Sequence, residues 1–375
     1  MAESRKMGYG NFGIVKSGGD SPGRIQPVRE KEHRNGFLIV SLDFELYWGV
    51  RDLITVEQCR EKLLAGRKAV FSLLELFTRY EIHATWATVG MLFFQSKKDL
   101  LRAVPTPTPR YRRRELSPYR DVETLGLDEE SDPCRYAPSL IRAIAAVPHQ
   151  EIGTHTFSHY YCLEDGQDLD SFRADLRAAQ HAAERLGIEL HSLVFPRNQV
   201  NRAYLEVCAE LGIKVYRGNN AGWMYAPRQR QHESPFRRAL RLVDLHCNVS
   251  GHNTYDPSEL CGSRPMNLPS SRYLSMGRRW LGPLEPLRIR RIQQEMTYAA
   301  RHGRVYHLWL HPEDVGPDLE RNVLFLKKVL DGFAGMRDRG EIESLNMKEF
   351  YHRISVNQEP KGSRAACPSA SGGYV

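Results

Sequence analysis

Apolar residues follow two different periods along the chain. Short runs rich in β-branched and aromatic residues, typical of buried strands, alternate with longer segments whose apolar residues recur every three or four positions, typical of amphipathic helices. The predicted strands cover residues 37–46, 83–92, 150–157, 191–196, 214–218 and 305–311. The predicted helices cover residues 55–80, 138–147, 170–187, 203–211, 288–302 and 318–335. Strand–helix repetition on this scale predicts an α/β fold with a parallel sheet and helical crossovers.

Three segments depart from this alternation. Residues 1–36 and 356–375 contain few large apolar side chains, so they are predicted to be a flexible N-terminal segment and a flexible C-terminal tail. Residues 104–135, which include "PTPTPRYRRR" and "DEESDP", are predicted to be an inserted loop, long enough to suggest a functional lid or disorder. The folded body is therefore expected to be a single catalytic domain over residues 37–355.

Charge and cysteine content narrow the possible partners and location. The formal net charge of +8 is compatible with an anionic partner, but the basic residues are not interleaved with aromatic ones, so nucleic acid is not expected. The seven cysteines are dispersed without a Cys-x-x-Cys pair, which indicates reduced thiols. No stretch has the pattern of a signal peptide or the ~20 apolar residues of a spanning helix. A cytoplasmic location is expected.

Residues capable of chemistry lie at or just beyond the carboxyl ends of the predicted strands. They are Asp43 and Glu45 at the end of the first strand, His155 and His159 at the end of the third, Arg197, Asn198 and Gln199 after the fourth, Arg217 and Asn219 at the end of the fifth, and His311 at the end of the last. In a parallel α/β barrel the active site lies at that face and is assembled from several strands. These residues are therefore expected to meet.

The segment "EIGTHTFSHYYC" (151–162) is the candidate for metal binding. His155 and His159 are four residues apart, a spacing that places both on one side of a strand or a helix. Zinc and related ions accept two imidazoles and a carboxylate, which Asp43 or Glu45 could supply. The simpler alternative is that the two histidines only cap strand ends by hydrogen bonding.

Two further histidines lie in "VYHLWLHPED". His307 lies deeper in the predicted strand and is expected to be a buried hydrogen-bonding residue. His311 lies at the mouth, where an imidazole could give a proton to a leaving group.

Four motifs resemble those of the polysaccharide deacetylase family, the NodB-homology domain of family 4-like carbohydrate esterases. They are "SLDFE" (41–45), "HTFSH" (155–159), "FPRNQ" (195–199) and "LWLHP" (308–312). The resemblance extends over about residues 37–350. It implies a distorted (β/α) barrel of seven to eight parallel strands and the metal-assisted removal of an acyl group from an N-acyl sugar, with metal-bound water as the nucleophile.

The resemblance also implies roles for individual residues. Asp43 would be the general base, His155 and His159 metal ligands, and His311 the general acid. Arg197 would support the base, although "FPRNQ" differs from the arginine–proline order of the family.

The first motif departs from the family, whose two aspartates are adjacent. Here Phe44 separates Asp43 from Glu45. Since residues i and i+2 of a strand face the same side, both carboxylates can reach the site, and Glu45 is assigned as the oxygen ligand. Asp43 as the ligand is the alternative.

The expected cofactor is a divalent metal, with zinc as the first candidate and cobalt, manganese and nickel as alternatives. The expected substrate is a small N-acyl sugar that carries a phosphate, a nucleotide or a lipid, or none of these. The candidate substrate-binding residues are Trp48, Asn198, Gln199 and Arg217. Two alternatives are an amidohydrolase of the same fold acting on a formyl group or a non-sugar amide, and a non-catalytic carbohydrate-binding protein with a degenerate site.

Overall fold

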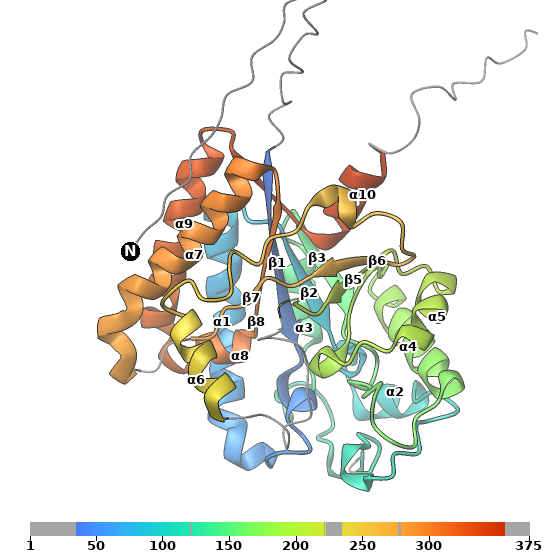
Figure 1. Ribbon diagram of the computed structural model, residues 1–375. Coiled ribbons are helices and arrows are strands. Elements are labelled where there is room, and N and C mark those ends of the chain that lie inside the picture. Colours follow the sequence, from blue (N-terminus) through green and yellow to red (C-terminus); the bar gives the residue numbers. More distant parts are fainter. Residues whose placement is uncertain (1–34, 121, 221, 223–234, 277–278, 357–375) are drawn as a thin grey trace, which may run out of the picture. The chain divides into compact units, whose positions relative to one another are not determined.

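The computed structural model describes residues 35–120, 122–220, 222, 235–276 and 279–356 (Figure 1). Nearly all of the predicted N-terminal segment (1–36) and C-terminal tail (356–375) lies outside these residues. The strands are β1 (Gly36–Phe44), β2 (Ala84–Thr88), β3 (Gln150–Thr154), β4 (Ser192–Val194), β5 (Val215–Gly218), β6 (Met266–Pro269), β7 (Arg272–Tyr273), β8 (Val305–Leu310) and β9 (Ile342–Leu345). The helices are α1 (Val56–Tyr80), α2 (Lys97–Arg102), α3 (Pro138–Ala145), α4 (Leu169–Glu184), α5 (Leu205–Glu210), α6 (Pro235–Asp244), α7 (Glu285–His302), α8 (Pro312–Val315), α9 (Leu319–Arg337) and α10 (Met347–Val356).

The strand pairs of the sheet are parallel. Hydrogen-bonded neighbours follow the order β6-β5-β4-β3-β2-β1-β8-β7. The strand β9 pairs with residues 36–39 of β1, and β2 pairs with residues 40–44, so these two strands share one edge of β1. The eight-strand path is the distorted (β/α) barrel that the motifs predicted, and β9 is a short additional strand.

The alternation of side chains along β1 gives the barrel an apolar end and a polar end. One face of the strand packs in the main core, through Leu38, Val40, Leu42 and Phe44. The other face begins with Phe37 and Ile39, which belong to a second apolar cluster that also contains residues of β5, β6, β8 and α10. It continues with Ser41 and Asp43, which are buried but polar. Because successive residues of a strand face opposite sides, these four residues share the interior face.

Helices cover the outside of the sheet and its amino-terminal end. Figure 1 shows α1, α7 and α9 close together near β1 and β8, and α4 and α5 on the side of β5 and β6. The helix α10 closes the amino-terminal end, where the ring of Phe350 packs edge-on against Phe37 and the Met347 N–H donates to Thr85 Oγ1 at 2.9 Å. The site must therefore lie at the other end of the strands.

The twelve elements predicted from apolar periodicity are all present, with ends that differ by a few residues. The elements that the sequence did not predict are short or lie after residue 220: α2, α6, α8, α10, β6, β7 and β9. Within residues 104–135 the chain is mostly irregular, and it packs Tyr111 and Leu116 against Tyr161. Among the described residues, no helix is both long and apolar enough to cross a membrane.

The fold yields a prediction about its core. Trp86 is fully buried, packs against Phe44 and Phe77, and donates from Nε1 to Gln150 Oε1 at 3.0 Å. We expect Trp86→Ala to lower the free energy of unfolding by about 3–5 kcal/mol, because it leaves a cavity. The control Phe71→Ala removes a ring that is 57% exposed on α1 and should change this free energy by no more than about 0.5 kcal/mol. Urea denaturation measures both, and equal losses would contradict this packing.

Candidate active site

The carboxyl ends of the strands bring together the residues that the sequence predicted to meet. Asp43 faces the interior from the end of β1, Arg217 does so from β5, and His311 directly follows β8. The loop after β3 carries His155 and His159, each about 1% exposed. Asp43 and Arg217 are also buried, whereas the side chain of His311 is 23% exposed.

Glu45 lies just beyond β1, where the chain turns sharply. The next residue, Leu46, has a φ of 46°, and the Leu46 N–H donates to Glu313 Oε1 at 2.7 Å. The side chain of Glu45 lies against Gly49, where an added Cβ would come within 1.9 Å of Glu45 Oε1. Gly49 therefore leaves the space in which this carboxylate points toward the histidines.

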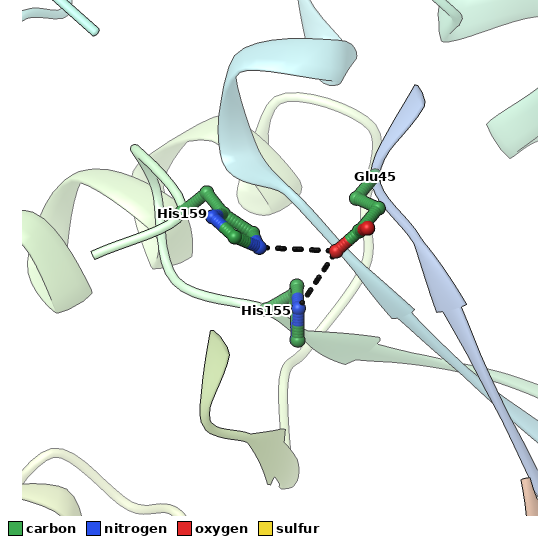
Figure 2. Close-up of side chains that lie close together, drawn as sticks. All are labelled: Glu45, His155 and His159. Atoms are coloured by element: carbon green, nitrogen blue, oxygen red, sulfur yellow. Dashed lines mark hydrogen bonds and ion pairs between the residues drawn. The ribbon is translucent and has the colours of Figure 1, made fainter. Parts of the chain in front are cut away.

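The carboxylate of Glu45 and the two imidazoles form a compact group (Figure 2). Glu45 Oε2 lies 3.2 Å from His155 Nε2 and 3.0 Å from His159 Nε2. The three residues are one of two groups of potential metal ligands in the described part of the chain. Zinc forms bonds of about 2.0–2.2 Å to such atoms, so separations near 3 Å are those expected between ligands of one ion.

The protonation of the imidazoles fits a cation. His155 Nδ1 lies 2.8 Å from the backbone oxygen of Val194, so Nδ1–H donates to this oxygen, and in the neutral imidazole, the form that binds a metal, Nε2 carries a lone pair. That buried Nε2 has no hydrogen-bond partner, although it faces a carboxylate oxygen. Burial lowers the pKa of His159 to about 4 despite the charge of Glu45, so this imidazole is neutral at neutral pH. A lone pair directed at a carboxylate is unfavourable unless a cation lies between them.

Asp43 is held by Arg217 and not by Arg197. Arg217 Nη1 and Nη2 donate to Asp43 Oδ1 and Oδ2 at 2.6 and 2.7 Å, and Nη1 also donates to Ser41 Oγ at 3.1 Å. The guanidinium lies 4.3 Å from the centre of the Trp309 ring. Burial alone would raise the pKa of Asp43, but the positive charge of Arg217 outweighs burial and lowers it. Asp43 is therefore ionised at neutral pH.

The expectation that Arg197 supports Asp43 is corrected by these contacts. Arg197 donates from Nη2 to both carboxylate oxygens of Asp52, at 2.6 and 2.8 Å, and lies over the ring of Tyr161. Its backbone has a φ of 55°, in a turn beyond the end of β4, so its side chain does not continue the interior face of the strand.

His311 is oriented by neighbours on the outer side of its ring. Its Nδ1 lies 3.5 Å from Asp314 Oδ2 and 3.4 Å from the hydroxyl of Tyr273, which itself donates to Asp314. Its Nε2 lies 3.8 Å from Asp43 Oδ2 and 3.7 Å from Glu45 Oε1. Burial alone would lower the pKa of His311, but the hydrogen bond to Asp314 and the charges of both site carboxylates raise it to about 9. The imidazole is therefore protonated at neutral pH, with Nε2–H directed into the site.

Two of the four candidate substrate-binding residues are not available to a ligand. Trp48 is 3% exposed and donates from Nε1 to the backbone oxygen of Arg135, so it is a core residue. Arg217 is occupied by Asp43. Asn198 and Gln199 are half-buried at the end of β4, where Asn198 Oδ1 accepts from Arg217 and Gln199 Oε1 accepts from the Leu163 N–H.

The sequence did not point to Asp314, Tyr273 or Asp52. Only Asp314 had a local signal, since it lies three residues after His311 in "HPED". Tyr273 reaches His311, and Asp52 binds Arg197 and Tyr161, through contacts that only tertiary folding creates.

The second group of potential ligands is His83, His149 and Glu349, and it is explained without a metal. Each imidazole Nδ1 faces one oxygen of Glu349, at 2.6 and 2.9 Å. The two rings are stacked, with centroids 3.7 Å apart and planes inclined by 6°. An imidazole binds a metal in its own plane, and nearly parallel stacked rings have no nearby point in both planes. This group holds α10 against the ends of β2 and β3.

Comparisons with known proteins agree with the predicted resemblance. Residues 54–216 match the family model described as polysaccharide deacetylase. This range contains His155 and His159, whereas Asp43, Glu45, Arg217 and His311 lie outside it. No curated protein matches the chain.

Solved structures with this fold carry more than one kind of name. A Mycobacterium smegmatis protein assigned to the polysaccharide deacetylases is 14% identical, with a TM-score of 0.55 over 88% of this chain and 94% of that chain. A Pseudomonas aeruginosa PAO1 protein with the same assignment is 12% identical, with a TM-score of 0.51 over 86% and 92%. The Puue allantoinase is 11% identical, with a TM-score of 0.52 over 86% and 91%. These similarities show the fold, and the resemblance to the polysaccharide deacetylase family is confirmed.

The geometry predicts which histidines bind metal. We expect His155→Ala and His159→Ala each to abolish stoichiometric binding of Zn²⁺, because each removes one of three protein ligands. His83→Ala and His149→Ala are matched controls from the stacked group and should leave Zn²⁺ binding unchanged. Calorimetric titration of the purified variants measures this. Loss of zinc binding in the controls alone would show that the metal binds instead to the group His83, His149 and Glu349, at the other end of the barrel.

Proposed function

We propose that this protein is a metal-dependent hydrolase that removes an N-acyl group, in particular N-acetyl, from a sugar or sugar derivative. The observation that carries the proposal is the convergence of a carboxylate–histidine group, an arginine-bound aspartate and a protonated histidine at one end of the barrel. His311 Nε2 lies within 3.8 Å of both Asp43 and Glu45. The resemblance to polysaccharide deacetylases supports the substrate class. The catalytic domain is assigned to residues 37–355.

The metal would be held by Glu45, His155 and His159, with Zn²⁺ as the first candidate among divalent ions. The choice of Glu45 over Asp43 rests on contacts, since Glu45 reaches both imidazoles while Asp43 is bound at both oxygens by Arg217. When bound, a divalent cation supplies Lewis-acid chemistry, namely a more acidic water and a polarised acyl carbonyl.

The remaining residues divide the proton transfers. Asp43, which Arg217 keeps ionised, accepts a proton from the attacking water as general base. His311, which Asp314 orients, donates its Nε2 proton to the departing amine as general acid. The two groups are close enough to act on one acyl carbon, and each begins in the protonation state that its role requires.

The substrate and location are proposed from charge and cysteines. The net charge of +8 supports a substrate that carries phosphate, such as a nucleotide-linked or lipid-linked sugar. The six cysteines among the described residues are free thiols, which supports a reducing compartment and hence the cytoplasm.

The test of this function is a substrate survey with the zinc-loaded protein. Candidate N-acetyl sugars, free and phosphate-linked, are incubated with it and followed by mass spectrometry, and the expected result is loss of one acetyl group with release of acetate. Turnover of a formyl or non-sugar amide instead would establish the alternative amidohydrolase. Sugar binding without hydrolysis of any amide would contradict a catalytic role.

The roles of the two carboxylates are separable. We expect Glu45→Gln to lose Zn²⁺ and activity together, because a neutral amide is a much poorer ligand than a carboxylate. Asp43→Asn should retain Zn²⁺ and lose turnover, because the amide cannot accept the proton. Metal content and kcat of both variants decide the assignment, and the reverse pattern would exchange the roles.

His311 is predicted to act only on the leaving group. We expect His311→Gln to lower kcat by about 10²–10⁴-fold with nearly unchanged KM and metal content, the range typical of positioned proton transfer. An acyl substrate with a good leaving group needs no protonation and should be affected much less. Because neutral His311 has no proton to donate, wild-type kcat should fall at alkaline pH, and the variant should lack this fall. Loss of metal in His311→Gln would instead make it a ligand.

A further inference from the structure

Asp175 lies on α4, outside the site described above, and its carboxylate is directed at the loop that carries both histidines. Asp175 Oδ1 accepts from the Phe157 N–H at 2.7 Å and from the Ser158 N–H at 3.4 Å. Asp175 Oδ2 accepts from the hydroxyl of Ser158. The Asp175 side chain and the loop residues 155–159 are fully or almost fully buried. Phe157 and Ser158 are the residues between the two proposed ligands.

The loop adopts a backbone conformation that needs support. Thr156 has a φ of 62° and His159 a φ of 54°, a region that residues other than glycine rarely occupy and β-branched residues least of all. Such conformations persist only where surrounding contacts determine them. The turn at His159 directs its Nε2 toward Glu45, so the metal site depends on this conformation.

Most buried N–H groups of this loop have one identified acceptor each. His155 N donates to the Thr88 backbone oxygen at 2.9 Å, and Thr156 N donates to Thr154 Oγ1 at 3.0 Å. The next two, on Phe157 and Ser158, both depend on Asp175. Buried donors without acceptors are costly, so removing this carboxylate should make the segment between the histidines rearrange.

We propose that Asp175 is a positioning residue for the metal site, which sets the separation of His155 and His159 from Glu45 by fixing the backbone between the two histidines. The inference rests on the proposed function only in that these residues bind a divalent cation. Residues that orient metal ligands typically contribute about 10–100-fold to metal affinity.

The experiment compares the Kd for Zn²⁺ of four proteins by calorimetric titration. Asp175→Ala removes the acceptor, and its Kd should rise by about 10–100-fold. Asp175→Asn keeps an oxygen for both N–H groups, and its amide can donate to Ser158 Oγ, so its Kd should stay within a few-fold of wild type. The fourth protein is the control Asp244→Ala. Asp244 is also fully buried and accepts from two backbone N–H groups and a serine hydroxyl, but it does so at Val249 and Ser250.

Each outcome bears on the inference. Asp244→Ala should be destabilised in thermal unfolding and retain the wild-type Kd, because its partners Val249, Ser250, Arg272 and Arg291 all lie outside the loop 155–159. An unchanged Kd in Asp175→Ala, or an equal rise in Asp244→Ala, would overturn the inference. If Asp175→Ala does not fold, Asp175→Glu provides the same test, since it keeps the charge but displaces the carboxylate, and an unchanged Kd there would also overturn it.

The proposed function fails in a different way. A wild-type protein that binds Zn²⁺ but hydrolyses no N-acyl sugar would contradict that function and leave the comparison of Kd values valid. A wild-type protein without measurable affinity for Zn²⁺ would overturn the inference about Asp175.

Discussion

The buried ion pair between Asp43 and Arg217 is the interaction on which the rest of the structure depends. The strands that carry them, β1 and β5, are separated by three other strands in the sheet. In a flat sheet they would be about 19 Å apart, since neighbouring strands lie about 4.8 Å from one another. Their side chains nevertheless meet at 2.6 and 2.7 Å. The pair can form only because the sheet curves into a barrel, and either charge alone would be strongly unfavourable there.

The neighbours of this ion pair explain why the side chains inside the barrel change from apolar to polar along the strands. Ser41 Oγ accepts a hydrogen bond from Arg217 and lies 2.9 Å from His307 Nε2. The polar contacts around Asp43 therefore continue along the strands toward their amino-terminal end. Burial lowers the pKa of His307 to about 3, which keeps this imidazole neutral beside the guanidinium. Below it, Ile39 and the apolar cluster under α10 begin. The ion pair between Asp43 and Arg217 thus lies at the same end of the barrel as Glu45, His155, His159 and His311.

The comparisons with known proteins and the geometry of the site answer different questions about this protein. The family match covers the loop with His155 and His159, and the fold similarity covers most of the chain. Proteins of this fold include an allantoinase as well as assigned polysaccharide deacetylases, so the fold alone leaves the substrate open. Asn198 and Gln199, the half-buried candidates for contact with the substrate, belong to a segment beyond the end of β4, and loops of this kind often carry specificity.

Apolar spacing by itself identified most strands and helices of the barrel, because it reflects the period of each element. The sequence also pointed to Glu45, His155 and His159 as candidates, but Glu45 lies beyond the end of β1 and the histidines lie in a loop with positive φ values, so their meeting does not follow from strand periodicity. The sequence did not identify which arginine serves Asp43. Arg197 and Arg217 both follow predicted strands, and only the folded backbone shows that the first lies in a turn with a positive φ and the second on an interior face.

Tertiary structure also decided the contributions of Trp48, Asp314 and Asp175. Trp48 looks like a sugar-stacking residue in the sequence, and its burial under residues far along the chain makes it part of the core. Asp175 is an ordinary helical residue by spacing, and it gains its contacts only when α4 packs against the loop after β3. Local patterns determine where a side chain points on its own element. What it meets there depends on elements distant in sequence, and only the curvature of the sheet and the packing of helices on it bring those together.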